Sequence, residues 1–448
     1  MTDAVAHYHD LLDAGWAADA QAHLERYQQQ HGLYFGERPL CSVLRPRLMS
    51  VPQYDFLRAR VKLLAQAFAK MQAAALADPA VRRQFGLTPE EEELVQDDPG
   101  FACAYPTSRL DAFYVSEDEL KFTEFNSETP AGAMYNHALI RLFHGMPVMR
   151  EFAKRWQTFS LPTHIGVVRA LLESYAEWAG RRDLPRIAIL DWKEVPTYSE
   201  FRLFDECFKH YGIDSVIADP REVELKDGKL WAEGKPIDLI YKRVLISELI
   251  ERGGLNHPVV RAVRARQVCM INPFRCKVLF KKASFAVLSD ERNRHLLAAE
   301  EWEAVAAHIP WTRTVEARRT EDPSGQSVDL VEYIGRQRER LVLKPNDDYG
   351  GKGIVLGWTV DAATWEQAIR TALATPYIVQ DRVRLPKEPY PDANDGALRI
   401  VDRMVDTDPY IIHGTYMEGS LCRISTEDLL NVTAGGGSTV PTFLVAPR

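Results

Sequence analysis

Two stretches in the first third of the chain decide the fold: Arg109-Leu-Asp111 and Phe122-Thr-Glu-Phe-Asn-Ser-Glu-Thr-Pro-Ala-Gly132. Alternating apolar residues on both sides of a short polar turn predict a β-hairpin. Glu124 and Asn126 are two residues apart, so their side chains project from one face of the second strand. Asp111 on the partner strand can reach the same face. Two carboxylates and an amide oxygen are therefore expected to converge.

Oxygen ligands of this kind suit magnesium, which binds through a few carboxylates and completes its shell with water and substrate phosphates. Arg109, two residues before Asp111, adds a cation suited to a phosphoryl group. The alternative is an ordinary exposed hairpin, whose solvated face is rich in charge in any case. The occurrence of all these features in order favours a metal site with Asp111, Glu124 and Asn126 as ligands.

The pattern Arg-x-Asp followed by Glu-x-Asn-x-x-x-Pro-x-Gly resembles the magnesium-binding end of the ATP-grasp ligases. In that superfamily the motif lies near the C-terminal end of the catalytic domain, whereas here it precedes the nucleotide-binding elements. This order resembles the circularly permuted ATP-grasp family, which includes the synthetase domain of glutathionylspermidine synthase. The resemblance covers the chain from about residue 100 to 448. It implies an α/β (α+β) ATP-grasp fold that is circularly permuted. An α/β substrate domain, of the kind that precedes the catalytic fold in this superfamily, would be inserted in the chain.

A glycine-rich turn follows the predicted strand 340–344, which ends in Lys344 and leads into Pro345-Asn-Asp-Asp-Tyr-Gly-Gly-Lys-Gly353. A lysine supplies a point charge to a phosphate, and glycines let backbone N–H groups close over it. The sequence is neither a Walker A loop nor the dinucleotide fingerprint. A plain hairpin turn explains Gly-Gly-x-Gly equally well, but its place between Lys282 and the predicted strand 377–383 favours a phosphate site.

The resemblance implies roles for residues in this part of the chain. It implies that phosphate is held by Lys282, Lys344, Gly350, Gly351 and Gly353. It also implies that adenine is bound by Gln380, Asp381 and Val383. Lys281 is the alternative to Lys282, because the sequence does not separate adjacent lysines. Arg423 matches an arginine on a strand that lines the active site in related permuted proteins, and its alternative is a surface ion pair. ATP and Mg²⁺ are the implied cofactors.

Three further features remain open in the sequence. Residues 431–438 (Asn-Val-Thr-Ala-Gly-Gly-Gly-Ser) resemble a loop of the permuted family, but the Lys-Asp expected next is Thr439-Val440. Asp402 is a candidate for an extra acidic ligand, although a charged position on a half-exposed strand is the preferred interpretation. Arg243, after the predicted strand 237–242, is a candidate to face the cleft, and a structural role is equally frequent there.

The chain is expected to contain four units. They are a helical N-terminal segment plus the metal-binding hairpin of the large subdomain (1–150), the α/β substrate domain (151–275), the lid subdomain with the glycine-rich loop (276–376) and the remainder of the large subdomain (377–448). Apolar spacing over residues 53–77 predicts a long helix, and residues 137–178 are expected to continue as helix interrupted by Pro147 and Pro162. Buried strands around a helix between residues 186 and 218 indicate a βαβ unit. The proline-dense segment 385–394 is expected to be a loop.

The composition, 46% hydrophobic and 26% charged over 448 residues, is ordinary for a globular protein. A net charge of −8 argues against a nucleic-acid partner held by general electrostatic attraction. No apolar run reaches the length of a bilayer, and the N-terminus lacks a signal peptide pattern, so we expect a cytoplasmic protein without a membrane partner. The six cysteines include no Cys-x-x-Cys pair, so neither a zinc site nor a disulfide framework is indicated.

These features predict an ATP-dependent carboxylate–amine ligase that forms an amide through an acyl-phosphate and releases ADP and phosphate. Such a protein positions the reactants and neutralises developing charge, and the catalytic cations would be Arg109 and Arg423. The partners would be a small-molecule carboxylate and an amine, whose identities the sequence does not give, and no general base is evident. The alternatives are a small-molecule kinase and a non-catalytic nucleotide-binding protein of the same fold. The intact acidic set and both lysines count against the latter.

Overall fold

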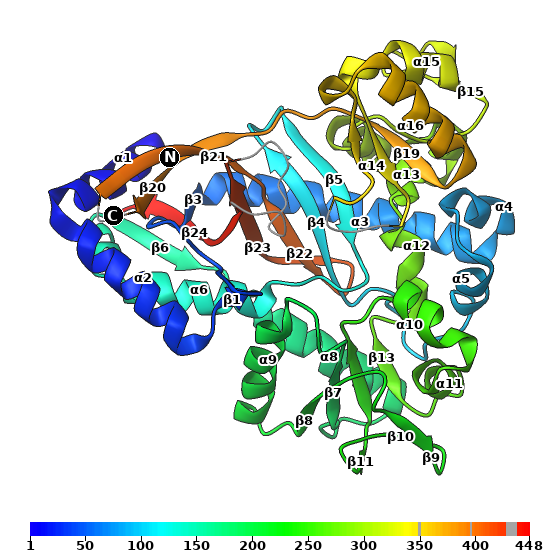
Figure 1. Ribbon diagram of the computed structural model, residues 1–448, viewed down its shortest axis with the longest axis horizontal. Helices are drawn as coiled ribbons and strands as arrows, with labels where there is room; N and C mark the ends of the chain where they lie inside the picture. The colour runs from blue at the N-terminus through cyan, green and yellow to red at the C-terminus, as the bar shows by residue number, and fades with distance from the viewer. Residues whose placement is uncertain (348–350, 395–396, 427–436) are drawn as a thin grey trace.

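A nine-stranded, mainly antiparallel sheet forms the centre of the computed structural model (Figure 1), which describes residues 1–347, 351–394, 397–426 and 437–448. The hairpin predicted from the sequence, β4 (Thr107–Tyr114) and β5 (Leu120–Asn126), forms one edge of this sheet, in the order β20-β21-β23-β22-β4-β5. The C-terminal strands continue it: β20 (Lys387–Asn394), β21 (Ala397–Val405), β22 (Asp408–Ile412), β23 (Tyr416–Ser425) and β24 (Ser438–Pro447). The hairpin and the strand that carries Arg423 therefore belong to one sheet.

The hairpin has the predicted polar face. Arg109 lies opposite Asn126, and Asp111 lies opposite Glu124. Directly opposed residues project from the same side of a sheet, so these four side chains share one face. The register shifts after Asp111 and leaves Thr123 with no residue opposite. This bulge lets apolar residues three positions apart both face the core.

Helix α3 (Val51–Ala77) packs behind the hairpin (Figure 1) and confirms the helix predicted from residue 53. Ser50 and Gln53 form a capping box at its N-terminus. Its Phe68 ring lies 4.7 Å from the Phe125 ring of β5. The other N-terminal elements are α1 (Thr2–Leu11), the π-helix η1 (Leu12–Trp16), α2 (Ala17–His31), β1 (Tyr34–Phe35), β2 (Arg38–Pro39), β3 (Arg47–Ser50), α4 (Pro79–Arg82), the 3₁₀ helix η2 (Arg83–Phe85) and α5 (Pro89–Leu94).

Two local predictions are wrong. The region after the hairpin contains β6 (Trp156–Ser160) between its helices, and the segment expected to be a proline-rich loop is β20. Strand β6 pairs with β24, so its partner is remote in sequence and invisible to local patterns. Strand β20 lies at the sheet edge, where Pro389 and Pro391 are tolerated because one side of the strand needs no ladder hydrogen bonds. The helices here are α6 (Ala133–Gly145), α7 (Pro147–Phe152) and α8 (Thr163–Ala179).

A parallel sheet forms a second unit, drawn below the central sheet in Figure 1, with strand order β13-β12-β7-β8. The βαβ prediction is confirmed by β7 (Ile187–Leu190), α9 (Tyr198–His210) and β8 (Ser215–Ala218). The remaining elements are β9 (Glu224–Lys226), β10 (Lys229–Ala232), β11 (Lys235–Pro236), β12 (Leu239–Lys242), α10 (Ile246–Gly253), η3 (Gly254–Asn256), α11 (Pro258–Arg264) and β13 (Cys269–Ile271).

A third unit, called the lid below, carries the antiparallel sheet β14-β19-β17-β18. Its elements are β14 (Thr312–Thr314), β15 (Arg319–Glu321), β16 (Ser327–Asp329), α15 (Leu330–Arg336), η6 (Arg338–Arg340), β17 (Leu341–Pro345), β18 (Val355–Leu356), η7 (Gly357–Thr359), α16 (Ala362–Ala374) and β19 (Tyr377–Asp381). The chain reaches it through η4 (Phe274–Cys276), α12 (Lys277–Phe280), α13 (Ala283–Ser289), η5 (Glu291–Leu296) and α14 (Ala299–His308).

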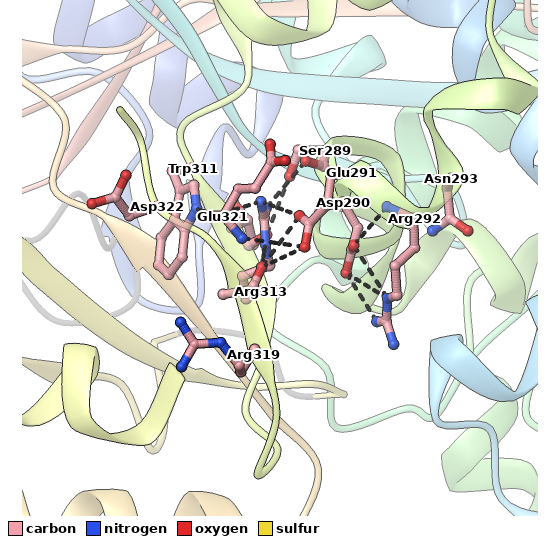
Figure 2. A network of polar contacts seen from close by, with 12 residues as sticks. Ser289, Asp290, Glu291, Arg292, Asn293, Trp311, Arg313, Arg319, Glu321 and Asp322 are labelled. Carbon is pink, nitrogen blue, oxygen red and sulfur yellow. Dashed lines mark hydrogen bonds and ion pairs between the residues drawn. The ribbon is translucent and has the colours of Figure 1, made fainter. Parts of the chain in front are cut away.

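A polar network fixes the lid sheet to the segment after α13 (Figure 2). Arg313 of β14 contacts Glu291 at 2.8 Å, and Trp311 donates from its indole N–H to the Glu321 carbonyl at 2.9 Å. Asp290 caps η5 by accepting from the Arg292 backbone N–H. The base of the lid is thus held by side chains as well as by the chain itself. Within the described residues, no helix combines the length and the apolar character needed to cross a membrane.

Candidate functional site

A cleft of about 800 Å³ lies between the hairpin β4–β5, the C-terminal strands and the lid. Most of the site residues predicted from the sequence line it: Asp111, Glu124, Lys344, Gly351, Gln380, Asp381, Val383 and Arg423. The hairpin and Gly351 of the glycine-rich turn therefore flank one cleft. Apolar side chains complete the walls, among them Val342, Leu356 and Met404.

Among the described residues, four further predicted ones do not line the cleft: Arg109, Asn126, Lys282 and Gly353. Arg109 and Asn126 lie on the polar face of the hairpin. Gly353 packs behind the lid strand, where Tyr377 Oη donates to its carbonyl at 3.4 Å. Gly350 lies outside the described residues, as does most of the 431–438 loop.

The acidic end of the cleft is a cluster of opposite charges. Arg109 donates from Nε to Asp111 Oδ1 at 2.8 Å, and Arg423 donates from Nη2 to Asp111 Oδ2 at 2.7 Å. Burial would raise the pKa of Asp111, but the two guanidinium charges outweigh burial and lower that pKa to about 2. Asp111 is therefore a carboxylate at every physiological pH, as a magnesium ligand must be.

Two residues of this cluster were missed in the sequence. Asp406 accepts from Arg423 Nε at 2.6 Å, and Asp408 lies 3.0 Å from Arg423 Nη2. Both carboxyls are buried, and burial raises their pKa despite the neighbouring arginine. The only sequence signal was two acids alternating at the start of a strand, which solvated strands also show. Asp402, the acid singled out instead, is exposed on β21.

Arg109 is buried, with 7% of its surface exposed. Besides Asp111, it donates from Nη1 to the Ala131 carbonyl at 2.8 Å. The guanidinium thus orients Asp111 and the segment after the hairpin. Its predicted role at the transferred phosphoryl group stays a prediction.

The Pro-x-Gly part of the sequence motif is the joint between the central sheet and the parallel-sheet unit. Arg243 donates from Nη1 to the Pro130 carbonyl at 2.7 Å, and Glu200 accepts from the Gly132 backbone N–H at 2.8 Å. Gly132 has φ of 101°, and a Cβ there would lie 2.9 Å from Tyr410 Oη. Glycine is therefore required both by backbone conformation and by space. Arg243, which the sequence suggested as a cleft residue, does not line the cleft and instead stabilises this joint through its hydrogen bond to Pro130.

The structure separates the two adjacent lysines. Lys282 Nζ donates to Glu124 Oε1 at 2.9 Å, so it faces the hairpin. Lys281 Nζ contacts Asp347 and Glu91, each at 2.7 Å, in a buried ion cluster behind the cleft. Lys282 therefore stays the candidate for phosphate, although it precedes helix α13 and does not lie on a strand as the family resemblance implied.

Lys344 is a half-buried cation on the lid side of the cleft. Its Nζ donates to Gln380 Oε1 at 2.7 Å across the β17–β19 pair. Burial lowers the pKa of Lys344 to about 8. The negative charge of Glu124 partly offsets this decrease, whereas the positive charge of Lys282 adds to it. A partly desolvated ammonium without a full counter-ion is a strong site for phosphate, because the ligand would supply the missing charge.

The residues present fit ATP. The volume lies within the usual range for ligand pockets, roughly 300 to 1,000 Å³, and the walls combine apolar side chains with a few polar groups. Among the described residues, Asp381 Oδ1 is buried without a hydrogen-bond partner. An exocyclic amine such as that of adenine would satisfy this acceptor.

Magnesium also fits the donor chemistry. Asp111 and Glu124 are opposed carboxylates on one face, and Asn126 lies on the same face. In the part of the chain that the structure describes, no three His, Cys, Asp or Glu side chains gather as a complete metal site. Magnesium seldom needs one, because it usually takes one or two carboxylates together with water and substrate phosphates.

Comparisons with known proteins bear on the fold. No family model and no curated protein matches the chain. Among solved structures, a glutathione synthetase-like effector from Globodera pallida matches 95% of this chain and 96% of its own, with a TM-score of 0.58 and 12% identity. D-alanyl-alanine synthetase A from Vibrio cholerae matches 57% of this chain and 74% of its own at 11% identity, and its TM-score of 0.29 carries no argument. The chain thus has an ATP-grasp-like fold of mixed α/β type along nearly its whole length.

Proposed function

We propose that this protein is an ATP-dependent ligase that joins a carboxylate to an amine through an acyl-phosphate. The observation that carries the proposal is the cleft itself, which brings Glu124, Lys344 and Arg423 together from three distant parts of the chain. Each offers what phosphoryl transfer needs, namely a metal-binding carboxylate, a partly desolvated ammonium and a guanidinium.

In this mechanism the protein's own residues hold and neutralise charge. Lys344 and Lys282 hold the phosphates, and Gly351 lets the backbone approach them. Asp381 accepts from the adenine amine. Arg423 holds the substrate carboxylate in line with the γ-phosphate, and it stabilises the charge that develops when the amine attacks. Magnesium on Asp111, Glu124 and Asn126 would neutralise the phosphate oxygens.

The order of the elements supports a circularly permuted ATP-grasp chain. The hairpin with the carboxylates precedes the lid lysine by about half of the chain, yet Asp111 and Lys344 line the same cleft. We extend the proposal to a family relationship with the synthetase domain of glutathionylspermidine synthase, a cytoplasmic location and small-molecule substrates. Residues 151–275 would form the substrate domain.

Incubation with ATP, magnesium and pools of carboxylates and amines tests the proposal. A ligase releases ADP only when both an acid and an amine are present. Release with one substrate and a stable phosphate ester would indicate a kinase. Nucleotide binding with no ADP release in any pool would indicate a non-catalytic protein.

A further inference from the structure

The contact between Asp406 and Arg423 joins the last residues before β22 to the strand that lines the cleft. Arg423 Nε donates to Asp406 Oδ2 at 2.6 Å, and the Arg423 backbone N–H donates to the other carboxylate oxygen. The Asp406 backbone N–H donates in return to the Arg423 carbonyl at 3.0 Å. One carboxylate thus fixes both the backbone and the side chain of the same arginine.

The backbone of Asp406 is itself held in place by a buried arginine. Arg47 of β3 donates from Nη1 to the Asp406 carbonyl at 2.6 Å and also contacts Thr407 Oγ1. Arg47 and Asp406 are both nearly fully buried, at 4% and 1% exposed. Because buried charge-assisted contacts are costly to break, the orientation of Asp406 is fixed before any ligand arrives.

The remaining contacts of Arg423 define which nitrogen is available to a ligand. Nε is taken by Asp406, and Nη2 lies between Asp111 at 2.7 Å and Asp408 at 3.0 Å. Among the described residues, no hydrogen bond is donated by Nη1. The Arg423 side chain keeps 22% of its surface exposed and lines the cleft. A guanidinium whose Nε and Nη2 are held in place can present Nη1 as a donor to an anion in a defined direction.

We propose that Asp406 is a positioning residue that holds Arg423 so that Nη1 faces an anionic group of the substrate in the cleft. The proposal rests on the proposed phosphate-binding function of this cleft. Asp406 carries a negative charge close to an anion site, and charge alone would make it unfavourable there. Its presence is explained if the gain from orienting the arginine exceeds this repulsion.

Asp406→Asn has two possible effects on anion binding, and they are opposite in sign. Removal of a negative charge beside the cleft would tighten anion binding if the carboxylate acted only through its charge. Asparagine keeps only one of the two acceptor oxygens, so it cannot hold both the backbone N–H and Nε of Arg423. This loss would loosen the guanidinium and weaken anion binding if the carboxylate acts by position. Inorganic pyrophosphate, titrated by calorimetry without magnesium, is a probe that requires neither turnover nor a metal.

We expect Asp406→Asn to weaken pyrophosphate binding about tenfold, the value of a hydrogen bond to a charged group. Asp402→Asn, which removes an exposed charge from β21, is the matched control and should leave the affinity unchanged. Asp406→Glu keeps the charge and should recover part of the loss. Arg423→Lys keeps the positive charge but lacks Nε, and combining it with Asp406→Asn should give no further loss.

Equal or tighter binding by Asp406→Asn would overturn the proposal, as would full additivity of the two substitutions. If Asp406→Asn fails to fold, the pyrophosphate affinities of Arg423→Lys and Asp406→Glu are compared with that of the wild type. Weaker binding by both variants supports the proposal, and unchanged binding by either overturns it. A wild-type protein that does not bind pyrophosphate would overturn both this inference and the proposed function. Absence of ligase turnover with the expected binding pattern would refute the ligase alone.

Discussion

Arg423 and Asp111 form an ion pair of 2.7 Å although 312 residues separate them in the chain. This contact joins the early hairpin to a C-terminal strand, and it places a guanidinium beside the carboxylate predicted to bind magnesium. The pair lies at one end of a cleft whose other wall carries Lys344. Opposite charges are thus arranged around a space that a triphosphate would fill.

Replacement of Glu124 by glutamine should remove magnesium-dependent turnover. The carboxylate is expected to act mainly in the transition state, so kcat should fall on the order of a hundredfold, with a smaller change in KM for ATP. Steady-state ADP release at saturating ATP and magnesium measures this. Asp118→Asn, in the turn of the same hairpin, is the control. Near-normal turnover of Glu124→Gln would remove the hairpin from the active site.

Replacement of Lys344 by methionine should weaken ATP binding without destabilising the free protein. The substitution keeps the length of a side chain whose charge is already disfavoured by burial, so thermal stability without ligand should be unchanged or higher. Calorimetry and thermal unfolding measure the two quantities. Lys229→Met, at an exposed position on strand β10, should change neither. An unchanged ATP affinity in Lys344→Met would contradict the assignment of this strand.

The affinity for ATP should fall as the pH rises above 8. Burial lowers the pKa of Lys344 to about 8 in the free protein, so the amine becomes neutral above this pH, whereas bound phosphate favours the ammonium and raises its pKa. Binding should therefore take up protons between about pH 8 and the ordinary lysine pKa of about 10.4. Calorimetry in two buffers of different ionisation enthalpy counts these protons. The uptake should disappear in Lys344→Met, and its persistence there would assign it to another group.

Replacement of Gly132 by alanine should destabilise the joint between the sheets. A left-handed conformation costs alanine about 1 to 2 kcal/mol, and the clash with Tyr410 adds about 1 to 3 kcal/mol. Gly180→Ala separates the two effects, because Gly180 also has positive φ but no atom within 4 Å of an added Cβ. Urea unfolding should show a larger loss for Gly132→Ala. Equal losses would mean that the tight packing at Tyr410 is not needed.

The sequence predicted the hairpin because its signals are local. Alternation, a polar turn and residues two apart fix which side chains share a face, and Asp111, Glu124 and Asn126 lie there. Helix α3 and the βαβ unit were predicted for the same reason, since each has its period within one segment.

The missed features depend on partners far away in the chain. Asp406 and Asp408 became part of the site only because strand pairing brought Arg423 and Asp111 beside them. Strand β20 was expected to be a loop because local patterns do not reveal that it lies at a sheet edge. Lys281 and Lys282 could be separated only by their partners, Asp347 and Glu124.

A crystal structure with magnesium and a non-hydrolysable ATP analogue tests the central claim most directly. The account predicts the triphosphate between Lys344 and Glu124, the metal on Asp111 and Glu124, and the adenine amine at Asp381. A nucleotide bound outside this cleft, or bound within it with no metal at the hairpin, would contradict the account.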